Sequence, residues 1–416
     1  MAAPKLRFKA FDENWEKVKF SEKFNFHSTN SYSRALLSEN GEIMNIHYGD
    51  IHTKFSMLFN VTKEQVPFLS DEVDIQKISQ NQFLQVGDLV IADASEDYKD
   101  IGKTIEIVNL DNQKIVAGLH TYIARPNHPF ALGFSGYLMQ TFEVREQIKK
   151  LATGISVLGI SKTNLGKVEL RIPYLEEQTK IASFLSAVDE KISQLTQKHE
   201  LLNQYKQGMM QKLFSQQLRF KADDGSEFGE WEEKALKTIA RIYDGTHQTP
   251  NYVEDGVPFY SVEHVTANNF SKTKFIAENV FLDELKRVQL EKNDILLTRI
   301  GDIGTSKLID WDVRASFYVS LALIKVDKNH NSSFVNQYIK SIFFQKELHE
   351  RTIHVAFPKK INLGEIGLCL IRLPCLAEQT KIANFLSAID QKIEVVAQQI
   401  EQAKQWKKGL LQQMFV

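Results

Sequence analysis

Three short segments contain residue types found in catalytic motifs, and each lacks a residue that the chemistry requires. Gly102-Lys103-Thr104 resembles the end of a phosphate-binding loop, but Asp97 stands where the backbone cradle needs a glycine. Asn127-His128-Pro129-Phe130 resembles the Asn-Pro-Pro-Phe signature of adenine methyltransferases, yet its second residue is histidine. His199-Glu200 would begin a zinc-protease helix, but Asn203 replaces the second histidine. We therefore predict no catalytic residue, no metal site and a protein that is not an enzyme.

Other polar residues are suited to hydrogen bonding rather than catalysis. The run Thr246-His247-Gln248-Thr249 combines donors and acceptors on an expected loop. In the first half of the chain, Asn30-Ser31-Tyr32-Ser33-Arg34 is the nearest comparable polar and aromatic cluster. Several basic side chains are further candidates for binding an anionic partner: Lys162, Lys272, Lys274, Arg299, Lys359 and Lys360. Each has a structural alternative, namely turn capping, a solvated lysine or, for Arg299, a local salt bridge.

Composition limits the class of protein. The 416 residues are 43% hydrophobic and 25% charged, values typical of globular domains, and the chain is long enough for two or more of them. No apolar run is long enough to cross a bilayer and the first residues lack a signal-peptide core, so we expect a cytoplasmic protein without a membrane partner. Cys369 and Cys375 are expected to be small buried residues. With a net charge of −1, binding to nucleic acid would require positive charge that is local or is supplied partly by a partner.

The elements that must position these residues form an internal repeat. Residues 172–215 align with 373–416 without a gap, and 22 of the 44 aligned pairs are identical. A second repeat joins Leu6-Arg7-Phe8-Lys9 to Leu218-Arg219-Phe220-Lys221, each followed by a tryptophan. The chain therefore consists of two copies of one unit, which predicts a pseudo-two-fold arrangement.

Each long repeat predicts a helix of about 57 Å that follows a proline. Apolar residues step by four and three along one seam, which is the pattern of a coiled coil. Lys206 and Lys407 occupy the same seam position, where a lysine either fixes the register or extends into solvent. Phe184, Phe214, Phe385 and Phe415 lie off the seam, so we expect partner helices to cover them. The seam residues are Ile181, Leu185, Val188, Ile192 and Leu195, then Ile382, Leu386, Ile389, Ile393 and Val396.

Two dissimilar regions precede the helices, and both have the pattern of mixed α/β structure. Gly87-Asp88-Leu89-Val90-Ile91-Ala92 matches Asn293-Asp294-Ile295-Leu296-Leu297-Thr298 in pattern, and each is followed by a glycine turn. We predict an α+β fold in which two mixed α/β domains are joined by two long antiparallel coiled-coil helices. The predicted divisions are 1–172, 173–215, 216–372 and 373–416, with a linker at 223–229.

In these features the chain resembles the specificity subunit of type I restriction-modification systems. The resemblance rests on two Pro-x-Leu-x-Glu-Gln-x-Lys-Ile-Ala segments, at 173–182 and 374–383. Asp244 to Pro250, Gly256-Val257-Pro258-Phe259 and Asp294 to Gly304 add to it, although the first region lacks the Asp-Gly-Thr-His stretch.

The resemblance implies two target-recognition domains, each reading one half of a bipartite asymmetric site on double-stranded DNA. The helices would set the spacer and dock two methyltransferase subunits, with two restriction-translocase subunits in the full complex. It also implies that S-adenosylmethionine is bound by the methyltransferase subunit and that this chain binds no cofactor.

Under this interpretation the clustered polar residues are candidate DNA contacts. The candidates are Ser31, Tyr32, Arg34, Lys162, Thr246, His247, Gln248, Thr249, Lys272, Lys274, Arg299, Lys359 and Lys360. We expect Lys162 to match Lys359 and Lys360 in position, since each precedes an Asn-Leu-Gly turn. Two rival interpretations are a standalone enzyme and a coiled-coil assembly scaffold that does not read DNA.

Overall fold

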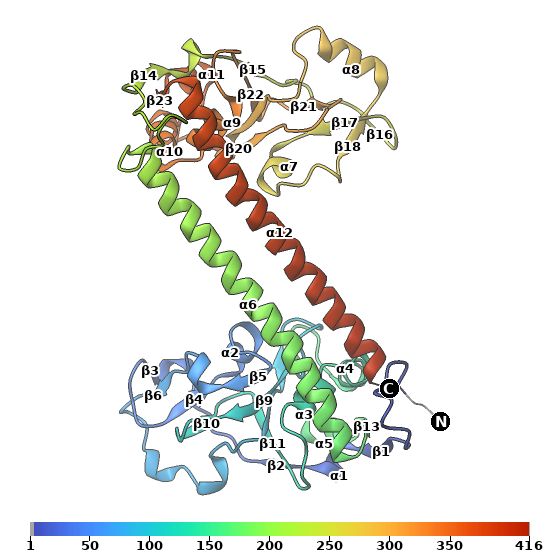
Figure 1. Ribbon diagram of the computed structural model, residues 1–416. Helices are drawn as coiled ribbons and strands as arrows, with labels where there is room; N and C mark the ends of the chain where they lie inside the picture. The colour runs from blue at the N-terminus through green and yellow to red at the C-terminus, as the bar shows by residue number, and fades with distance from the viewer. Residues whose placement is uncertain (1–3, 416) are drawn as a thin grey trace. The chain divides into compact units, whose positions relative to one another are not determined.

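The computed structural model describes residues 4–415, which divide into two compact units (Figure 1). Unit 1 contains the chain up to Thr196 together with the stretch from Gln398 onward, and unit 2 contains Gln197–Ala397. Helix α6 (Leu175–Phe214) therefore begins in unit 1 and ends in unit 2, whereas α12 (Leu376–Met414) begins in unit 2 and ends in unit 1. The two helices, of 40 and 39 residues, run between the units in opposite directions.

Unit 1 is built on two sheets and two short strand pairs. The five-stranded sheet has the order β2-β11-β7-β9-β5, and the four-stranded sheet has the order β10-β4-β6-β3. The remaining strands pair as β1 with β13 and β8 with β12. The strands are β1 (Glu16–Lys19), β2 (Phe24–His27), β3 (Leu37–Ser38), β4 (Met44–Ile46), β5 (Leu58–Asn60), β6 (Phe68–Leu69), β7 (Leu89–Ala92), β8 (Ala94–Ser95), β9 (Thr104–Asn109), β10 (Ile115–Ala117), β11 (Thr121–Pro126), β12 (Leu158–Gly159) and β13 (Glu169–Ile172).

Unit 2 repeats this plan with fewer strands. One sheet has the order β15-β22-β19-β20, the other has the order β16-β18-β17-β21, and β14 pairs with β23. The strands are β14 (Glu232–Ala235), β15 (Ala240–Asp244), β16 (Tyr252–Val253), β17 (Val257–Tyr260), β18 (Lys274–Ile276), β19 (Ile295–Ile300), β20 (Asp302–Leu308), β21 (Ser316–Phe317), β22 (Leu321–Val326) and β23 (Leu370–Leu373).

Short helices complete each unit. In unit 1 they are α1 (Phe20–Lys23), α2 (Tyr48–Thr53), α3 (Phe134–Leu138), α4 (Phe142–Leu151) and α5 (Lys162–Gly166). In unit 2 they are α7 (Val262–Thr266), α8 (Glu278–Leu285), α9 (Ser332–Ile339), α10 (Ile342–Arg351) and α11 (Leu363–Leu368).

The two matched apolar segments form equivalent strands. β7 and β19 both lie inside a sheet, and the aspartate that precedes each is buried. Asp88 accepts a hydrogen bond from the Gln85 N–H and pairs with Arg125 at 2.8 Å, while Asp294 accepts from the Glu291 N–H and pairs with Lys325 at 2.7 Å. The mixed α/β prediction is thus confirmed, and the repeated aspartate ties the turn before each strand to a basic side chain.

The seam of the long helices is largely buried, as the heptad pattern predicts. Leu185 and Leu386 are fully buried, and Leu195 and Val396 are buried as well. Each end of a helix packs into the core of the unit in which it lies: Leu410 and Met414 join the core of unit 1, and Leu213 joins that of unit 2.

The expectation that partner helices cover the off-seam phenylalanines is wrong for Phe214 and Phe415, which are buried within the chain itself. Phe415 packs edge-on against Trp15 in unit 1, and Phe214 packs against Phe334 in unit 2. The other two are half-buried and contact the repeated Leu-Arg-Phe-Lys segments, with Phe8 against Phe184 and Phe220 against Phe385. The expectation treated the helices as an isolated pair, whereas each unit folds around them.

The seam lysines do not extend into solvent. The Nζ of Lys407 lies 2.5 Å from a carboxylate oxygen of Asp189 in unit 1, and the Nζ of Lys206 lies 2.6 Å from Asp390 in unit 2. The two pairs are related by the repeat offset of 201. Each aspartate also accepts a hydrogen bond from its own domain, from Tyr137 in unit 1 and Gln337 in unit 2. These partly buried polar contacts fix the register of the helices within each unit.

The repeated Glu-Gln pair anchors each helix to its domain. Arg7 forms two hydrogen bonds of 2.7 Å with the buried Glu177, and Arg219 does the same with Glu378 at 3.1 and 2.8 Å. Gln178 accepts a hydrogen bond from the N–H of Ala131, as Gln379 does from the N–H of Asn331. The motif that opens both helices is therefore structural.

The segment before each mixed region is hydrogen-bonded to the C-terminal end of a long helix. The N–H of Leu218 donates to the carbonyl of Lys212 at the end of α6, at 3.1 Å. The N–H of Leu6 donates to the carbonyl of Gln413, which is the repeat equivalent of Lys212, at 2.8 Å. Residues 4–9 thus occupy the same place beside the end of α12 in unit 1 that residues 216–221 occupy beside the end of α6 in unit 2.

The two cysteines differ in exposure. Cys369 is buried as expected and its burial raises the pKa of the thiol to about 12. Cys375 is exposed, contrary to the prediction, because it precedes the first turn of α12.

Candidate functional site

The two predicted polar clusters occupy equivalent loops, although their sequences share no motif. Each loop follows an edge strand, β2 or β15, which pairs antiparallel with β11 or β22. The N–H of Asn30 donates to the carbonyl of Ala117 at 3.0 Å, and the N–H of Thr246 donates to Phe317, its counterpart at the end of β21, at 3.1 Å. We call residues 29–34 and 245–250 the recognition loops.

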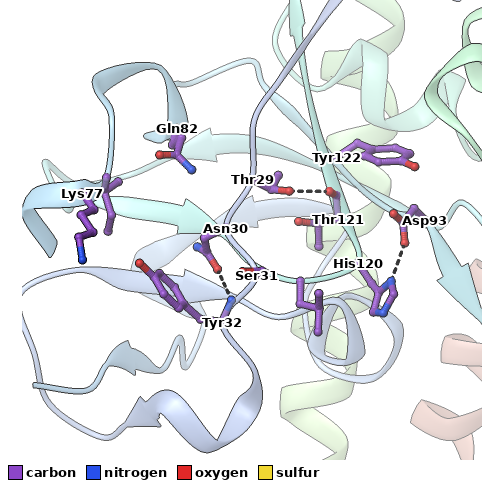
Figure 2. A pocket seen from close by; sticks show the side chains of 12 residues that line it. Thr29, Asn30, Ser31, Tyr32, Lys77, Gln82, Asp93, His120, Thr121 and Tyr122 are labelled. Atoms are coloured by element: carbon purple, nitrogen blue, oxygen red, sulfur yellow. Dashed lines mark hydrogen bonds and ion pairs between the residues drawn. The ribbon is translucent and has the colours of Figure 1, made fainter. Parts of the chain in front are cut away.

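The recognition loop of unit 1 lines an open cavity of about 440 Å³ (Figure 2). Asn30 organises it by donating to the Asn45 side chain at 2.8 Å and accepting from the N–H of Tyr32 at 3.1 Å. Ser31 is exposed and Tyr32 is half-buried beside it. Asp93 and His120 pair at 3.2 Å on the opposite wall. The cavity is therefore lined mainly by side chains that can form hydrogen bonds.

Arg34 is held by unit 1 itself. Its Nη2 lies 3.0 Å from the buried carboxylate of Asp50 and 3.1 Å from the His47 ring. Burial and the positive charge of Arg34 lower the pKa of His47, which favours a neutral imidazole that accepts a hydrogen bond. About half of the Arg34 side chain stays exposed, so the guanidinium remains at the surface.

In unit 2, only part of the predicted run faces solvent. Thr246 is buried and its Oγ1 donates to the carbonyl of Gln248 at 3.3 Å, which is the turn-capping alternative. His247, Gln248 and Thr249 are exposed. The Thr249 hydroxyl lies 3.2 Å from that of Tyr318.

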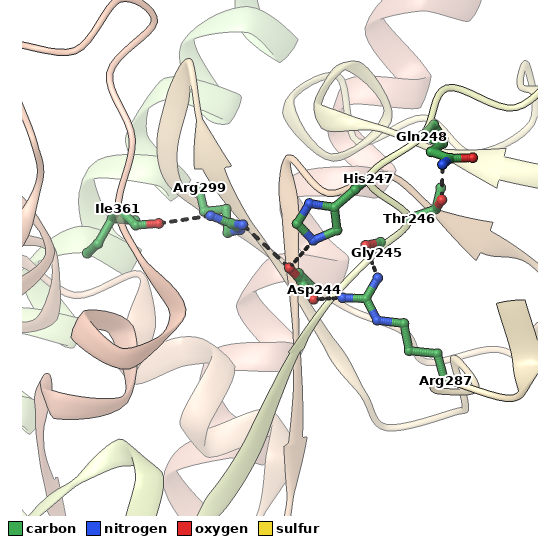
Figure 3. Close-up of polar contacts among 8 residues, drawn as sticks. All are labelled: Asp244, Gly245, Thr246, His247, Gln248, Arg287, Arg299 and Ile361. Carbon is green, nitrogen blue, oxygen red and sulfur yellow. Dashed lines mark hydrogen bonds and ion pairs between the residues drawn. The ribbon is translucent and has the colours of Figure 1, made fainter.

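Asp244 is the centre of a charged network that the sequence reasoning missed (Figure 3). Its carboxylate lies 2.7 Å from the Nε2 of His247, pairs with Arg287 and lies 3.7 Å from Arg299. Arg287 also donates to the carbonyl of Gly245 at 2.7 Å. Asp244 precedes the predicted run by only two residues, so the sequence could have indicated its contact with His247. Arg287 is 43 residues from Asp244 in the chain, and no local pattern predicts that pair.

Arg299 belongs to this network rather than to the surface. It is 8% exposed, its Nη1 donates to the carbonyl of Ile361 at 3.2 Å, and desolvation lowers its pKa. Arg299 therefore forms a local salt bridge, which was the structural alternative to a contact with an anionic partner. Its unit 1 counterpart, Asp93, pairs with His120 instead.

The predicted lysines are all exposed, but they do not occupy matched positions. Lys162 opens α5, and its Nζ lies 5.2 Å from the centroid of the Tyr122 ring. Lys359 and Lys360 lie before α11, on a strand-like segment that bridges to Ile300 and Ile353. Their equivalents are therefore near Leu158 and Gly159, and the expected match with Lys162 is wrong. Lys272 precedes β18, and Lys274 is its first residue, with its Nζ 4.6 Å from the centroid of the Tyr252 ring.

Neither a metal centre nor a membrane-spanning helix is found in the described part of the chain. Residues 4–415 contain no group of three His, Cys, Asp or Glu side chains that could hold a metal ion. Within the same range no helix is both long and apolar enough to cross a bilayer.

Comparison with known proteins points to one family. Residues 12–204 and 229–405 match the family model of the type I restriction modification DNA specificity domain. The type I restriction enzyme MjaVIII specificity subunit of Methanocaldococcus jannaschii is 29% identical over 296 residues, covering 66% of this chain and 68% of that protein. The putative MjaX specificity subunit of the same organism is 29% identical over 346 residues, covering 79% and 77%.

Solved structures share the fold. The S subunit of a type I restriction-modification system from M. genitalium superposes with a TM-score of 0.64 at 17% identity, covering 100% of this chain and 99% of that one. A chain from a structural study of complex assembly and conformational transition in a type I R-M system gives 0.55 at 15% identity, covering 97% and 98%.

Proposed function

Because the chain belongs to the type I restriction-modification DNA specificity family, we propose that it selects the DNA sequence on which a type I restriction-modification complex acts. The observation that carries the proposal is the equivalence of the two recognition loops. Both are anchored by the same backbone hydrogen bond, and they present different side chains. Two readers with one framework and different surfaces suit a bipartite, asymmetric DNA site.

The proposed partners follow from this role. We propose that the chain binds double-stranded DNA together with two methyltransferase subunits, and with two restriction-translocase subunits in the full complex. The chain would itself be non-catalytic, and S-adenosylmethionine would be bound by the methyltransferase subunit. The proposed compartment is the cytoplasm, where such a subunit would meet its DNA.

The exposed and half-buried residues of the recognition loops are the proposed DNA contacts. Ser31, Tyr32 and Arg34 would act in the domain of residues 1–172, and His247, Gln248 and Thr249 in the domain of residues 216–372. Arg299 and Thr246 would support the second loop from within. The alternative, a coiled-coil scaffold without DNA reading, gives no role to the polar cavity beside residues 29–32.

A region swap tests the two-reader proposal. Residues 16–160 are replaced by the equivalent region of a relative, and methylated sequences are mapped in a host that carries the methyltransferase subunit. We expect one half of the methylated site to change and the other to stay intact. The loop variant Gln248→Ala should relax only the unchanged half. If both halves change in the swap, or if methylation does not depend on this chain, the proposal is wrong.

A further inference from the structure

Each unit carries a hairpin beside its recognition loop, and both hairpins end in exposed apolar side chains. Hairpin 1 comprises residues 153–160, in which Thr153 and Gly159 exchange backbone hydrogen bonds of 2.9 and 2.7 Å. Hairpin 2 comprises residues 353–361, closed by the hydrogen bond from the Ile353 N–H to Lys360 at 2.8 Å. They follow α4 and α10 and precede α5 and α11, so they are equivalent elements.

The tips expose apolar side chains almost completely. Ile155 is 102% exposed in hairpin 1, and Val355 and Phe357 are 96% and 105% exposed in hairpin 2. A single exposed apolar side chain is ordinary on a protein surface. Full exposure at the tip of the same element in both units, in domains of dissimilar sequence, indicates a shared role for the tips.

Backbone hydrogen bonds tie each hairpin to the recognition loop of its unit. The N–H of Ile160 donates to the carbonyl of Asp93, which lines the cavity of the first recognition loop. The N–H of Ile361 donates in the same way to Arg299, which belongs to the Asp244 network. In unit 2 the Gly301 N–H also donates to Lys359. A partner that covers a recognition loop would therefore meet the adjacent hairpin as well.

The charge around the tips favours an anionic partner. Residues 152–163 and 352–361 contain no aspartate or glutamate. Lys359 and Lys360 are exposed and follow Phe357 after a single proline, and Lys162 follows hairpin 1 at the start of α5. An apolar tip flanked by lysines is complementary to the apolar bases and the charged phosphates of DNA. Two or three apolar side chains are too few for a stable protein interface by themselves.

We propose that the two hairpin tips enter a groove of the bound DNA and place Ile155 and Phe357 against the bases, while Lys359 and Lys360 contact phosphates. This inference rests on the proposed function, because it assumes that the recognition loops face DNA. It assigns the tips a contact that is apolar and insensitive to salt, distinct from the hydrogen bonding of the recognition loops.

The test measures DNA binding by the purified complex with its methyltransferase subunits. The probe is a fluorescein-labelled duplex carrying the sequence that methylation mapping identifies, with a scrambled duplex as reference. Phe357→Ala should weaken specific binding about tenfold, as the loss of one apolar base contact does. The slope of log affinity against log salt should stay at the wild-type value, since no phosphate contact is removed.

Two variants serve as matched comparisons. Lys359→Ala should weaken binding to both duplexes and reduce the salt slope by about 1. Ile342→Ala removes another exposed apolar side chain, at the start of α10 and about 14 Å along that helix from the hairpin. It should bind as the wild type does. Ile155→Ala should weaken specific binding in the same way, but through the half-site that unit 1 contacts rather than the one that unit 2 contacts.

The outcomes separate this inference from the proposed function. If the wild-type complex does not distinguish the two duplexes, the proposed function fails. If it does and Phe357→Ala binds normally, only the hairpin inference fails. The inference also fails if Phe357→Ala lowers the mass of the complex in light scattering, because the tip then docks on a protein subunit.

Discussion

Glu106 shows how a single residue can make unit 1 sensitive to pH. Its carboxylate is 1% exposed and accepts hydrogen bonds of 2.6 Å from the N–H groups of Gly133 and Gly136, at the start of α3. Gly133 has no side chain with which to cap this helix, and Glu106 supplies the cap from β9. Desolvation raises the pKa of Glu106 to about 7, because it outweighs the two N–H donors, which lower the pKa.

A raised carboxyl pKa stabilises the fold at low pH. The contribution is complete below the unfolded pKa of 4.5 and is lost as pH rises towards 7. We expect the free energy of unfolding of wild type, relative to Glu106→Gln, to fall by about 2 to 3 kcal/mol between pH 5 and pH 8. Urea unfolding at both pH values measures this difference. A gap between wild type and variant that does not change with pH would contradict it.

Residue-scale expectations from sequence succeeded where the chemistry is local. Thr246 caps its own turn, as one of its two predicted roles required. Arg299 differs, because its burial depends on Asp244 and Ile361, which are 55 and 62 residues away in the chain. Phe214 was misjudged for the same reason, since its cover comes from the distant Phe334.

At the scale of elements, the seam ion pairs link each long helix to the other within one unit. Lys206 and Asp390 lie 2.6 Å apart, with side-chain exposures of 12% and 40%. Breaking a partly buried pair leaves a charge without a partner, whereas exchanging the charges restores it. We expect Lys206→Asp to lower the free energy of unfolding by about 3 kcal/mol. The double variant Lys206→Asp and Asp390→Lys should regain more than half of that loss.

Thermal unfolding of the four proteins in this cycle gives the coupling energy. The exposed pair Lys286 and Asp283 in unit 2 provides the control, since exchanging its charges should change stability by less than about 1 kcal/mol. Additive single effects in the Lys206 and Asp390 cycle would show that the pair does not hold the register.

The long helices also predict the distance between the two half-sites. Four residues inserted after Leu195 and after Val396 fall next to the boundary between the units, at residues 196–197 and 397–398. They lengthen each helix by about 6 Å, which corresponds to roughly two base pairs of B-DNA. We expect both half-sites to keep their sequences while the spacer grows, with some loss of affinity because a four-residue stutter unwinds the seam. Methylation mapping that returns the original spacer at full efficiency would contradict this.

Helices and loops differ in how far sequence alone predicts them. The helices could be predicted because an ungapped repeat and a heptad seam are both visible in the chain. The equivalence of the recognition loops could not, since Asn30 and Thr246 correspond only through backbone hydrogen bonds to Ala117 and Phe317. The hairpin tips gave no signal either, because an apolar residue in a variable loop is indistinguishable in sequence from a core residue.

At the scale of the whole molecule, the hydrogen bond from Leu6 to Gln413 brings the N-terminal segment next to the last turn of α12. A direct peptide bond between residues 416 and 1 would leave eight residues between Gln413 and Leu6, where five separate Lys212 from Leu218. In both units a mixed α/β domain precedes a long helix, which ends in the other unit.

A circular permutant tests this topology. With residues 416 and 1 joined and new ends placed between Asp224 and Gly225, in the exposed polar turn after Phe220, the chain should direct methylation to the same two half-sites with the same spacer. Reopening the chain between Leu296 and Leu297, inside the buried strand β19, should abolish methylation. Methylation of the same sites by the permutant would show that the two domains and the two long helices can be joined in a different order without loss of their spacing.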